Sequence, residues 1–380
     1  VSGVLNASGR FAAAASAPVF LNIILIGALL ATDTVLSDVS ILPADIVGGA
    51  QGTAVAFGAV LAGIVQLAIV WVAARRAGFN LRPKRPRWTP ELKRLAIIAA
   101  PAALAGGVVQ VNLLIGRQVA SFFDGAVAWL SYADRLYQLP LGVVGIAIGI
   151  VLLPDLSRKL QADDTAGGQN ALSRAAEMSM ALAIPSAVAL AIIPVSLVQA
   201  LFERGAFDAD DTAATALACA VYGLGLPAFI LQKVVQPLYF AREDTRRPFY
   251  YAVFAMVVNA AIAIGLAPFI GFIAAALATT LAGWAMLAML WLGTRGMGEA
   301  ARFDTRAKSR IWRVLLASAL MGAVLWPGQS LLAPMMGTPQ LKIAGLAILC
   351  TMGFVTYALA GLALGAFRRN EVVQAFRRQR

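Results

Sequence analysis

The sequence predicts an all-α, polytopic membrane protein, and two observations carry that prediction. Hydrophobic residues make up 60% of the 380 positions and charged residues only 13%, with a mean hydropathy of +0.78, whereas soluble domains carry about 25% charged residues. The apolar runs mostly reach about twenty residues, which is the length of a membrane-spanning helix and about twice that of a barrel strand. Helices are therefore the expected spanning elements.

About ten apolar spans are expected, each long enough to cross a bilayer. They lie at residues 11–31, 47–73, 92–122, 126–153, 170–201, 212–240, 247–268, 271–293, 309–334 and 341–367. The loops between them alternate in charge: "AREDTRRP" is basic, for example, and "FERGAFDADD" is acidic. Because cytoplasmic loops are enriched in Lys and Arg, we expect the basic loops, Arg10 and the C-terminus in the cytoplasm.

The formal net charge of +12 fits either a nucleic-acid surface or membrane topology. The basic segment 73–94 includes Trp88 among its arginines, as an RNA-binding surface would. The same basic composition recurs at every expected cytoplasmic turn, so we favour topology and expect no nucleic-acid partner. The tail "FRRNEVVQAFRRQR" leaves two interpretations open, an interfacial helix on anionic membrane lipids or a disordered basic tail.

The residue inventory argues against enzyme chemistry. The sequence has no histidine, which excludes a Ser-His-Asp triad and a histidine metal site. It has no G-x-x-x-x-G-K-[ST] loop, so we do not expect ATP hydrolysis. Cys219 and Cys350 each lie singly in an apolar stretch and are expected to be small packed residues. We predict no enzyme activity, no metal site and no resident cofactor.

An internal repeat appears in the pattern L-A-G-x-x-x-L-A-x-x-W. Residues 61–71 read "LAGIVQLAIVW" and residues 281–291 read "LAGWAMLAMLW". In the span before each copy, an arginine is followed twelve residues later by an asparagine, at Asn22 and Asn259. Six spans separate the copies, which run the same way across the membrane, so we expect two parallel six-helix lobes with a functional cavity between them.

The repeat also predicts the domain organisation. The chain starts at Val1 without a methionine, and we expect an N-terminally truncated protein that lacks about four preceding helices. The expected parts are the end of an N-terminal lobe at 1–76, a basic cytoplasmic linker at 77–91, a C-terminal six-helix lobe at 92–294, and two additional helices with a basic tail at 295–380.

Two charges lie inside the apolar segment "YADRLYQLPLGVVGIAIGIVLLP". Arg135 is expected about 15 Å into its helix, near the bilayer middle. An arginine there costs between about 2.5 and over 10 kcal/mol unless it faces water or a partner. Ser131, Arg135, Gln138 and Gly142 follow helical spacing and form one polar stripe. We predict that this stripe lines a cavity and that Arg135 binds an anionic substrate there.

The neighbouring Asp134 has a different expected partner. Its side chain points about 100° away from that of Arg135. Arg117, on the preceding span, lies about as far before the "DGAV" turn as Asp134 lies after it. We predict an Arg117–Asp134 ion pair that leaves Arg135 free for an anion. The alternative is that the charges cap one another merely for packing.

A proline and two glycines follow the charged residues in the same span. Pro140 removes one backbone hydrogen bond, and Gly142 and Gly145 permit bending or close packing. Bending and close packing both stay open as explanations, and bending would make these three residues a hinge.

Amide side chains also lie within the spans. Asn22, Asn112 and Asn259 are most simply interhelical hydrogen-bonding groups. Asn259 together with Thr279, and with Thr280 beside it, forms a candidate cation site, although neither of the two helices supplies a carboxylate. A sodium ion is the only cofactor that this site suggests.

Three stretches carry a resemblance to a known family. "SYADRLYQLPLGVVGIAIGIVLLPDLSRKL", "LFERGAF" and "VLNASGRFAAAASAPVFLNIILIG" closely resemble the MurJ/MviN family of lipid II flippases. That family belongs to the multidrug/oligosaccharidyl-lipid/polysaccharide (MOP) exporter superfamily. The resemblance implies a fourteen-helix, two-lobe transporter, of which this chain would supply helices five to fourteen.

The resemblance also implies a function. Family members move lipid II, the undecaprenyl-diphosphate-linked peptidoglycan precursor, from the cytoplasmic to the outer leaflet of the bacterial plasma (inner) membrane. They use alternating access without ATP, for cell-wall synthesis and cell shape. The implied partners are lipid II, membrane lipids and the cell-wall synthesis machinery.

Two family features bear on single positions. One of the essential cavity arginines of the family matches Arg135, and the others belong to helices that precede this chain. Some relatives bind sodium through polar residues that match Asn259 and Thr279, but Ala263 stands where an aspartate is expected. Arg117 is unusual for the family.

Two alternatives remain at this point. The first is another MOP-superfamily exporter, for a lipid-linked polysaccharide or a drug. Drug exporters typically bind cations, whereas a cavity with a positive mid-membrane charge favours an anionic substrate. The second is a non-transporting scaffold for the cell-wall machinery.

Overall fold

The computed structural model describes residues 5, 12–34, 49–79, 89, 90, 93, 107, 108, 110–162 and 164–367. Arg10, the acidic loop after residue 34, most of the basic linker and the tail after residue 367 lie outside the described residues. The chain divides into two compact units, Val1–Arg94 and Leu95–Arg380. The expected finer division at residues 76, 91 and 294 stays a prediction.

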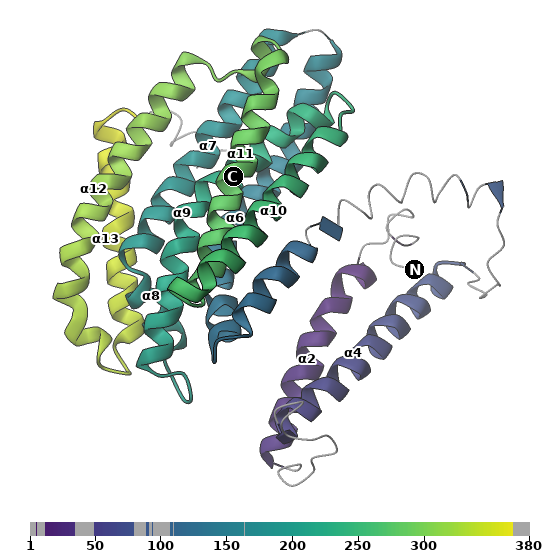
Figure 1. The fold of residues 1–380 in the computed structure, drawn as a ribbon, viewed down its shortest axis with the longest axis vertical. Coiled ribbons are helices and arrows are strands. Elements are labelled where there is room, and N and C mark those ends of the chain that lie inside the picture. The colour runs from purple at the N-terminus through teal and green to yellow at the C-terminus, as the bar shows by residue number, and fades with distance from the viewer. Residues whose placement is uncertain are drawn as a thin grey trace. The chain divides into compact units, whose positions relative to one another are not determined.

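The first unit contains two helices that pack on each other, α2 (Ala12–Thr34) and α4 (Gly49–Arg76) (Figure 1). A Cβ atom on Gly58 would lie only 3.1 Å from the Cβ of Ala28, so these small residues permit the close approach. At the end of α4, the Arg75 guanidinium lies 5.7 Å from the centre of the Trp71 ring. The first copy of the repeat therefore forms part of a packed helix pair.

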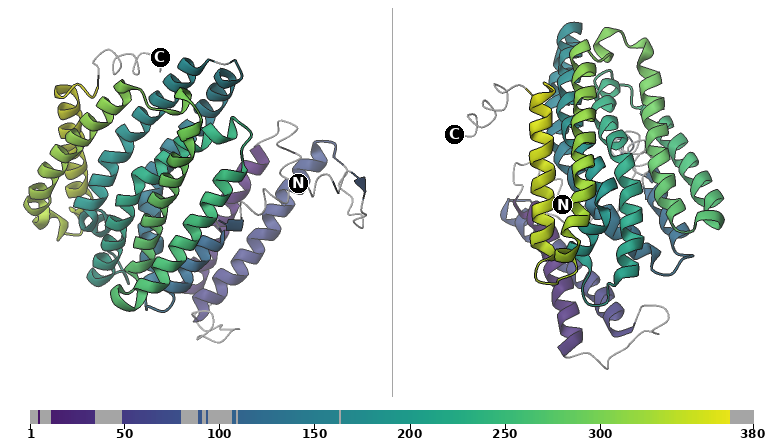
Figure 2. Two further views of the ribbon diagram at one scale, coloured as in Figure 1. Left: turned by 45° about the horizontal axis from the view of Figure 1, so that its top comes forward. Right: turned by 90° about the vertical axis from the view of Figure 1, so that its left-hand side faces the viewer.

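The second unit is a helical bundle, and its described part contains no strand (Figures 1 and 2). Residues 110–120 are helical. The helices that follow are α6 (Ala126–Gln161), α7 (Thr165–Ile192), α8 (Pro194–Phe202), α9 (Ala209–Phe240), α10 (Arg246–Ile270), α11 (Ile273–Gly293), α12 (Thr305–Met336) and α13 (Lys342–Ala363), with short 3₁₀ turns at Thr294–Gly296 and Glu299–Ala301.

Seven helices of the described chain are long and apolar enough to cross a membrane. The all-α membrane fold is thus confirmed, while the expected number of ten spans stays a prediction. The helix order across the second unit is α13, α12, α7, α9, α11 and α10, each packed on the next, with α6 against both α7 and α9. The second copy of the repeat lies on α11, which packs on α10 as α4 packs on α2.

Two expectations are corrected. The span expected at 170–201 is broken at Ile193, where ψ is 36° and the backbone leaves the helix. Pro194 starts α8 at this break because a proline lacks an N–H and is tolerated only in a first helical turn. Cys219 is buried as expected, but Cys350 is exposed on α13 rather than packed.

A seam of buried polar contacts joins α9 to α11. The Gln232 amide donates to the carbonyl of Gly283 at 2.7 Å, and the Tyr239 hydroxyl donates to the carbonyl of Leu290 at 2.6 Å. In the other direction, the Thr280 hydroxyl donates to the carbonyl of Val221 at 2.8 Å. Each bond satisfies a side chain that would otherwise be costly to bury. These three hydrogen bonds therefore hold α9 and α11 firmly together.

The bundle has two ends that differ in charge. We call the end with residues 203–208 and the turn at 121–125 the acidic-loop end, and the end with residues 241–248 and 294–310 the basic-loop end. At the acidic-loop end, the Trp129 indole N–H donates to the Asp211 carboxylate at 2.6 Å. This contact fixes the start of α6 against the start of α9.

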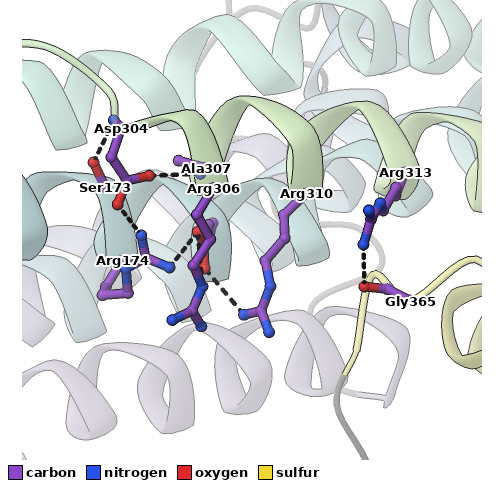
Figure 3. A network of polar contacts seen from close by, with 9 residues as sticks. Ser173, Arg174, Asp304, Arg306, Ala307, Arg310, Arg313 and Gly365 are labelled. Atoms are coloured by element: carbon purple, nitrogen blue, oxygen red, sulfur yellow. Dashed lines mark hydrogen bonds and ion pairs between the residues drawn. The ribbon is translucent and has the colours of Figure 1, made fainter.

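An ion-pair network joins α7 to α12 at the basic-loop end (Figure 3). The Glu177 side chain is only 7% exposed and pairs with Arg174, with Arg310 at 3.1 Å and with Arg306 at 3.8 Å. Arg174 also pairs with Asp304, which caps α12 by accepting a hydrogen bond from its first turn. The network therefore connects residues more than 120 positions apart in the sequence.

A second ion pair fastens α13 at the acidic-loop end. The Lys342 ammonium lies 2.7 Å from the Glu203 carboxylate, which also accepts from the Thr212 hydroxyl at 3.0 Å. Burial alone would raise the pKa of Glu203, but the hydrogen bonds from Lys342, Thr212 and Gln199 outweigh it and hold that pKa below its usual value.

Acid should therefore weaken this attachment of α13. Because the folded pKa of Glu203 lies below the unfolded value of about 4.3, the stabilisation is complete above that pH and is lost as the pH falls through the folded pKa. Thermal unfolding in detergent should show that acidification from pH 6 costs the wild type about 1 kcal/mol more than it costs Glu203→Gln. An equal acid dependence of the two proteins would contradict this role of Glu203.

Candidate functional site

A cavity of about 360 Å³ lies between the helical residues 110–120 and helices α6, α9 and α11. Its apolar lining comes mainly from alanine, leucine and valine side chains. Its polar lining consists of Asn112, Arg117, Ser131, Asp134, Arg135, Tyr137, Gln138, Tyr222 and Thr279. Most of the charged and hydrogen-bonding side chains of the cavity therefore come from the helix at residues 110–120 and from the first half of α6.

Three of the four residues of the predicted polar stripe on α6 face this cavity, and the fourth, Gly142, is not part of its lining. Ser131, Arg135 and Gln138 all contribute to its lining, as the i, i+4, i+7 spacing requires. The Ser131 hydroxyl donates back to the carbonyl of Val127 at 2.6 Å, so its oxygen retains only acceptor capacity toward the cavity. Arg135 is exposed to the cavity and makes no hydrogen bond or ion pair with any described residue.

Asp134 lies half-buried on the same lining and has local partners. The Gln138 amide, one turn along α6, donates to its carboxylate. The Tyr137 hydroxyl also interacts with that carboxylate, and the Tyr137 ring packs 5.1 Å from the ring of Tyr222 on α9. These tyrosines were not predicted from the sequence, although Tyr137 follows Asp134 at a helical spacing of three residues.

Arg117 and Asp134 share the cavity but do not form the predicted direct ion pair. The positive charges of Arg117 and Arg135 both act on the Asp134 carboxylate, yet no Arg117–Asp134 ion pair of 4.0 Å or less occurs among the described residues. The turn occupies residues 121–125, so Arg117 lies four residues before its first residue and Asp134 lies nine residues after its last. This mismatch of five residues corresponds to about 7.5 Å along the helix axis.

The candidate hinge lies within a continuous helix. α6 runs through Pro140, Gly142 and Gly145 without a break. A Cβ atom on either glycine would meet no described atom within 4 Å, so close packing against described residues does not explain why glycine occurs there.

The amides connect α10 to the helix at 110–120. The Asn259 side chain is 1% exposed and donates to the Asn112 side-chain carbonyl at 2.7 Å. The Oδ1 atom of Asn259 is buried without a partner among described residues. Asn22 is exposed within its own unit, so the hydrogen-bonding role expected of these amides is observed for Asn112 and Asn259.

The candidate cation site offers only neutral oxygens. The Thr279 hydroxyl already donates to the carbonyl of Ala275 at 2.9 Å, and the Ala263 methyl group is fully buried. Thr280 faces α9 instead. No metal-binding cluster of His, Cys, Asp and Glu occurs among the described residues. Because hard cations are bound mainly through carboxylates and carbonyl groups, this set fits a sodium ion poorly.

The geometry agrees with a comparison against protein families. The model of the family described as lipid II flippase MurJ matches residues 1–363. The chain belongs to the MurJ family. MurJ proteins are transporters of the membrane, which agrees with the apolar helices and with a polar cavity that shows no catalytic constellation in its described lining.

Individual MurJ relatives extend this assignment. The chain is 41% identical over 378 residues to the probable lipid II flippase MurJ of Rhizobium meliloti (strain 1021), covering 97% of this chain and 69% of the relative. It is 39% identical to the counterpart in Rhizobium tropici, with the same coverage, and 33% identical over 298 residues to lipid II flippase MurJ of Burkholderia cenocepacia, covering 78% of this chain and 56% of that protein.

A solved MurJ structure has the same fold. It is described as lipid II flippase MurJ in an inward closed conformation, and it matches with a TM-score of 0.71 at 22% identity. The match covers 94% of this chain and 68% of that structure.

Proposed function

We propose that this chain moves lipid II from the cytoplasmic to the outer leaflet of the bacterial inner membrane by alternating access. Membership of the MurJ family supports the transport reaction and its substrate. The basic loops and the C-terminus would lie in the cytoplasm, as the distribution of Lys and Arg favours. Lipid II and the surrounding membrane lipids are the proposed partners, and the cell-wall synthesis machinery would use the product.

The observation that carries the proposal is the state of Arg135. This arginine lines a polar cavity without a bonding partner among the described residues. An arginine at the depth of a bilayer is costly unless it faces water or an anion. The diphosphate of a lipid-linked precursor is such an anion, and a hydrated cavity lets it cross while the lipid tail stays in hydrocarbon. Ser131 and Gln138 would assist Arg135 in binding.

The hinge belongs to the same proposal. Alternating access requires one part of the transporter to rock or bend against another. Pro140 weakens the backbone hydrogen bonding of α6, and Gly142 and Gly145 have free space around them among the described residues. Bending at this place would move the cavity end of α6 relative to its other half. Sodium coupling is not proposed, because the donor set at Asn259 and Thr279 lacks a carboxylate.

The main competing function is export of another MOP-superfamily substrate, such as a lipid-linked polysaccharide or a drug. A drug cation would be repelled by the two arginines of the cavity, which outnumber the single carboxylate of its described lining. A polysaccharide linked to a diphosphate lipid would be attracted by them. The charge of the cavity therefore argues against the drug but not against the polysaccharide.

Depletion and rescue tests the proposed function directly. A bacterium is depleted of its own flippase and supplied with the full-length gene that encodes this chain, and lipid II accessible at the outer cell surface is measured. We expect the gene to restore most of the accessible lipid II. An empty vector is the control. Vector-level accessibility despite normal membrane insertion would contradict lipid II transport and favour the polysaccharide exporter.

A further inference from the structure

We propose that Arg117 is a second substrate-binding cation and that Arg117 and Arg135 together form a two-cation site selective for a diphosphate over a monophosphate. The inference rests on the proposed function, because it assigns a specificity-determining residue to the same cavity. It also replaces the expectation that Arg117 is neutralised by Asp134.

Both guanidinium groups of the cavity are available to a ligand. Arg117 and Arg135 come from different helices, are exposed, and line the same cavity. Neither forms a hydrogen bond or an ion pair with a described residue. By contrast, Arg242 donates to the carbonyls of Leu238 and Met297, and Arg313 donates to the carbonyl of Gly365. Arg242 and Arg313 thus have internal partners that the two cavity arginines lack.

Asp134 supplies the only carboxylate in the described cavity lining. Asp134 is half-buried and accepts a hydrogen bond from Gln138, and the Tyr137 hydroxyl also interacts with it. Arg117 acts on Asp134 only at longer range, so it keeps all of its donors for a ligand. Two arginines and one aspartate leave the lining with one net positive charge, which attracts an anion.

The two arginines lie at different depths. Arg117 lies four residues before the turn at 121–125 and Arg135 lies ten residues after it, so their Cα atoms differ in depth by about 9 Å. Long arginine side chains can converge across such an offset. A single guanidinium fork can bind one phosphate in a bidentate manner. Two forks from opposite sides suit two linked phosphates, whereas a monophosphate occupies one fork only.

The test compares the binding of two short-chain prenyl phosphates to the full-length protein in nanodiscs of zwitterionic lipid. The probes are farnesyl diphosphate and farnesyl monophosphate, and the measurement is the dissociation constant of each by titration calorimetry. We expect the wild type to bind the diphosphate about tenfold more tightly than the monophosphate. Arg117→Gln should abolish this preference by weakening only diphosphate binding, and Arg117→Lys should keep part of it.

The matched control is Arg204→Gln, which removes the same charge from an exposed position outside the cavity lining. It should leave both affinities unchanged. The inference is overturned if Arg117→Gln keeps the diphosphate preference, or if it weakens both ligands equally. In either case diphosphate binding that still depends on Arg135 would leave the proposed function standing. Failure of the wild type to bind either lipid would overturn both proposals.

Discussion

Full-length protein carrying Arg135→Ala should fail to restore surface-accessible lipid II in cells depleted of their own flippase. The substitution removes the deeper of the two cavity cations and leaves Arg117 opposite Asp134 with no net positive charge in the described lining. A diphosphate would then have to leave water without compensation, which is strongly unfavourable in a membrane. We expect less than about a tenth of the wild-type signal, a loss of at least about 1.4 kcal/mol in transport.

Arg135→Lys and a control on the same helix sharpen this test. Lysine keeps the charge but loses the bidentate fork, so it should retain intermediate activity. Arg158→Ala removes an arginine from the other end of α6, where the side chain is 77% exposed and pairs loosely with Asp155 at 3.6 Å, and it should transport normally. Full rescue by Arg135→Ala at equal protein level would remove Arg135 from the mechanism and support a scaffold role.

Glu177→Ala should produce the largest loss of stability. The Glu177 carboxylate is almost fully buried, and its removal takes away the acceptor that Arg174, Arg306 and Arg310 share. Breaking a buried ion pair costs about 3–5 kcal/mol, and the partial exposure of the arginines reduces this to about 2–3 kcal/mol. Thermal unfolding in detergent should therefore shift downward by several degrees.

One variant separates the charge of Glu177 from its packing, and a second variant serves as a control. Glu177→Gln keeps the volume and removes the charge, so it should lose most of the same stability. Glu299→Ala removes an exposed carboxylate at the same end of the bundle and should change the unfolding temperature little. Equal melting of Glu177→Ala and wild type would mean that the network has no energetic role.

Local patterns predicted those parts of the site that lie on one helix. Ser131, Arg135 and Gln138 were found because a helical period needs only the sequence of α6. The failures involve distances between helices. The Arg117–Asp134 contact was expected from counting residues on each side of a turn, and the extent of that turn is not encoded in such a count. The break at Ile193 was signalled by Pro194, but an apolar run continues on both sides of it.

Long-range contacts were beyond the reach of sequence patterns. The partners of Glu177 on α12 lie more than 120 residues away, and no spacing rule connects such positions. Tyr222 joins the cavity only because α9 packs beside α6. The family resemblance pointed to Arg135, yet it could not reveal that Arg117 remains unpaired with any described residue, since that arginine is unusual for the family.

The seam between α9 and α11 constrains how this sequence can change. Each of its bonds runs from a side chain to a backbone carbonyl, from Gln232, Tyr239 and Thr280 to Gly283, Leu290 and Val221. A carbonyl is present whatever residue carries it. Leu290 and Val221 are therefore free to exchange for side chains of similar size, whereas Gly283 is held by the Phe229 ring, 2.5 Å from where a Cβ would lie. Each donor position must keep its hydroxyl or amide. We expect tolerated substitutions among the residues that supply the carbonyl groups, Gly283 excepted, and not among the residues that supply the side-chain donors.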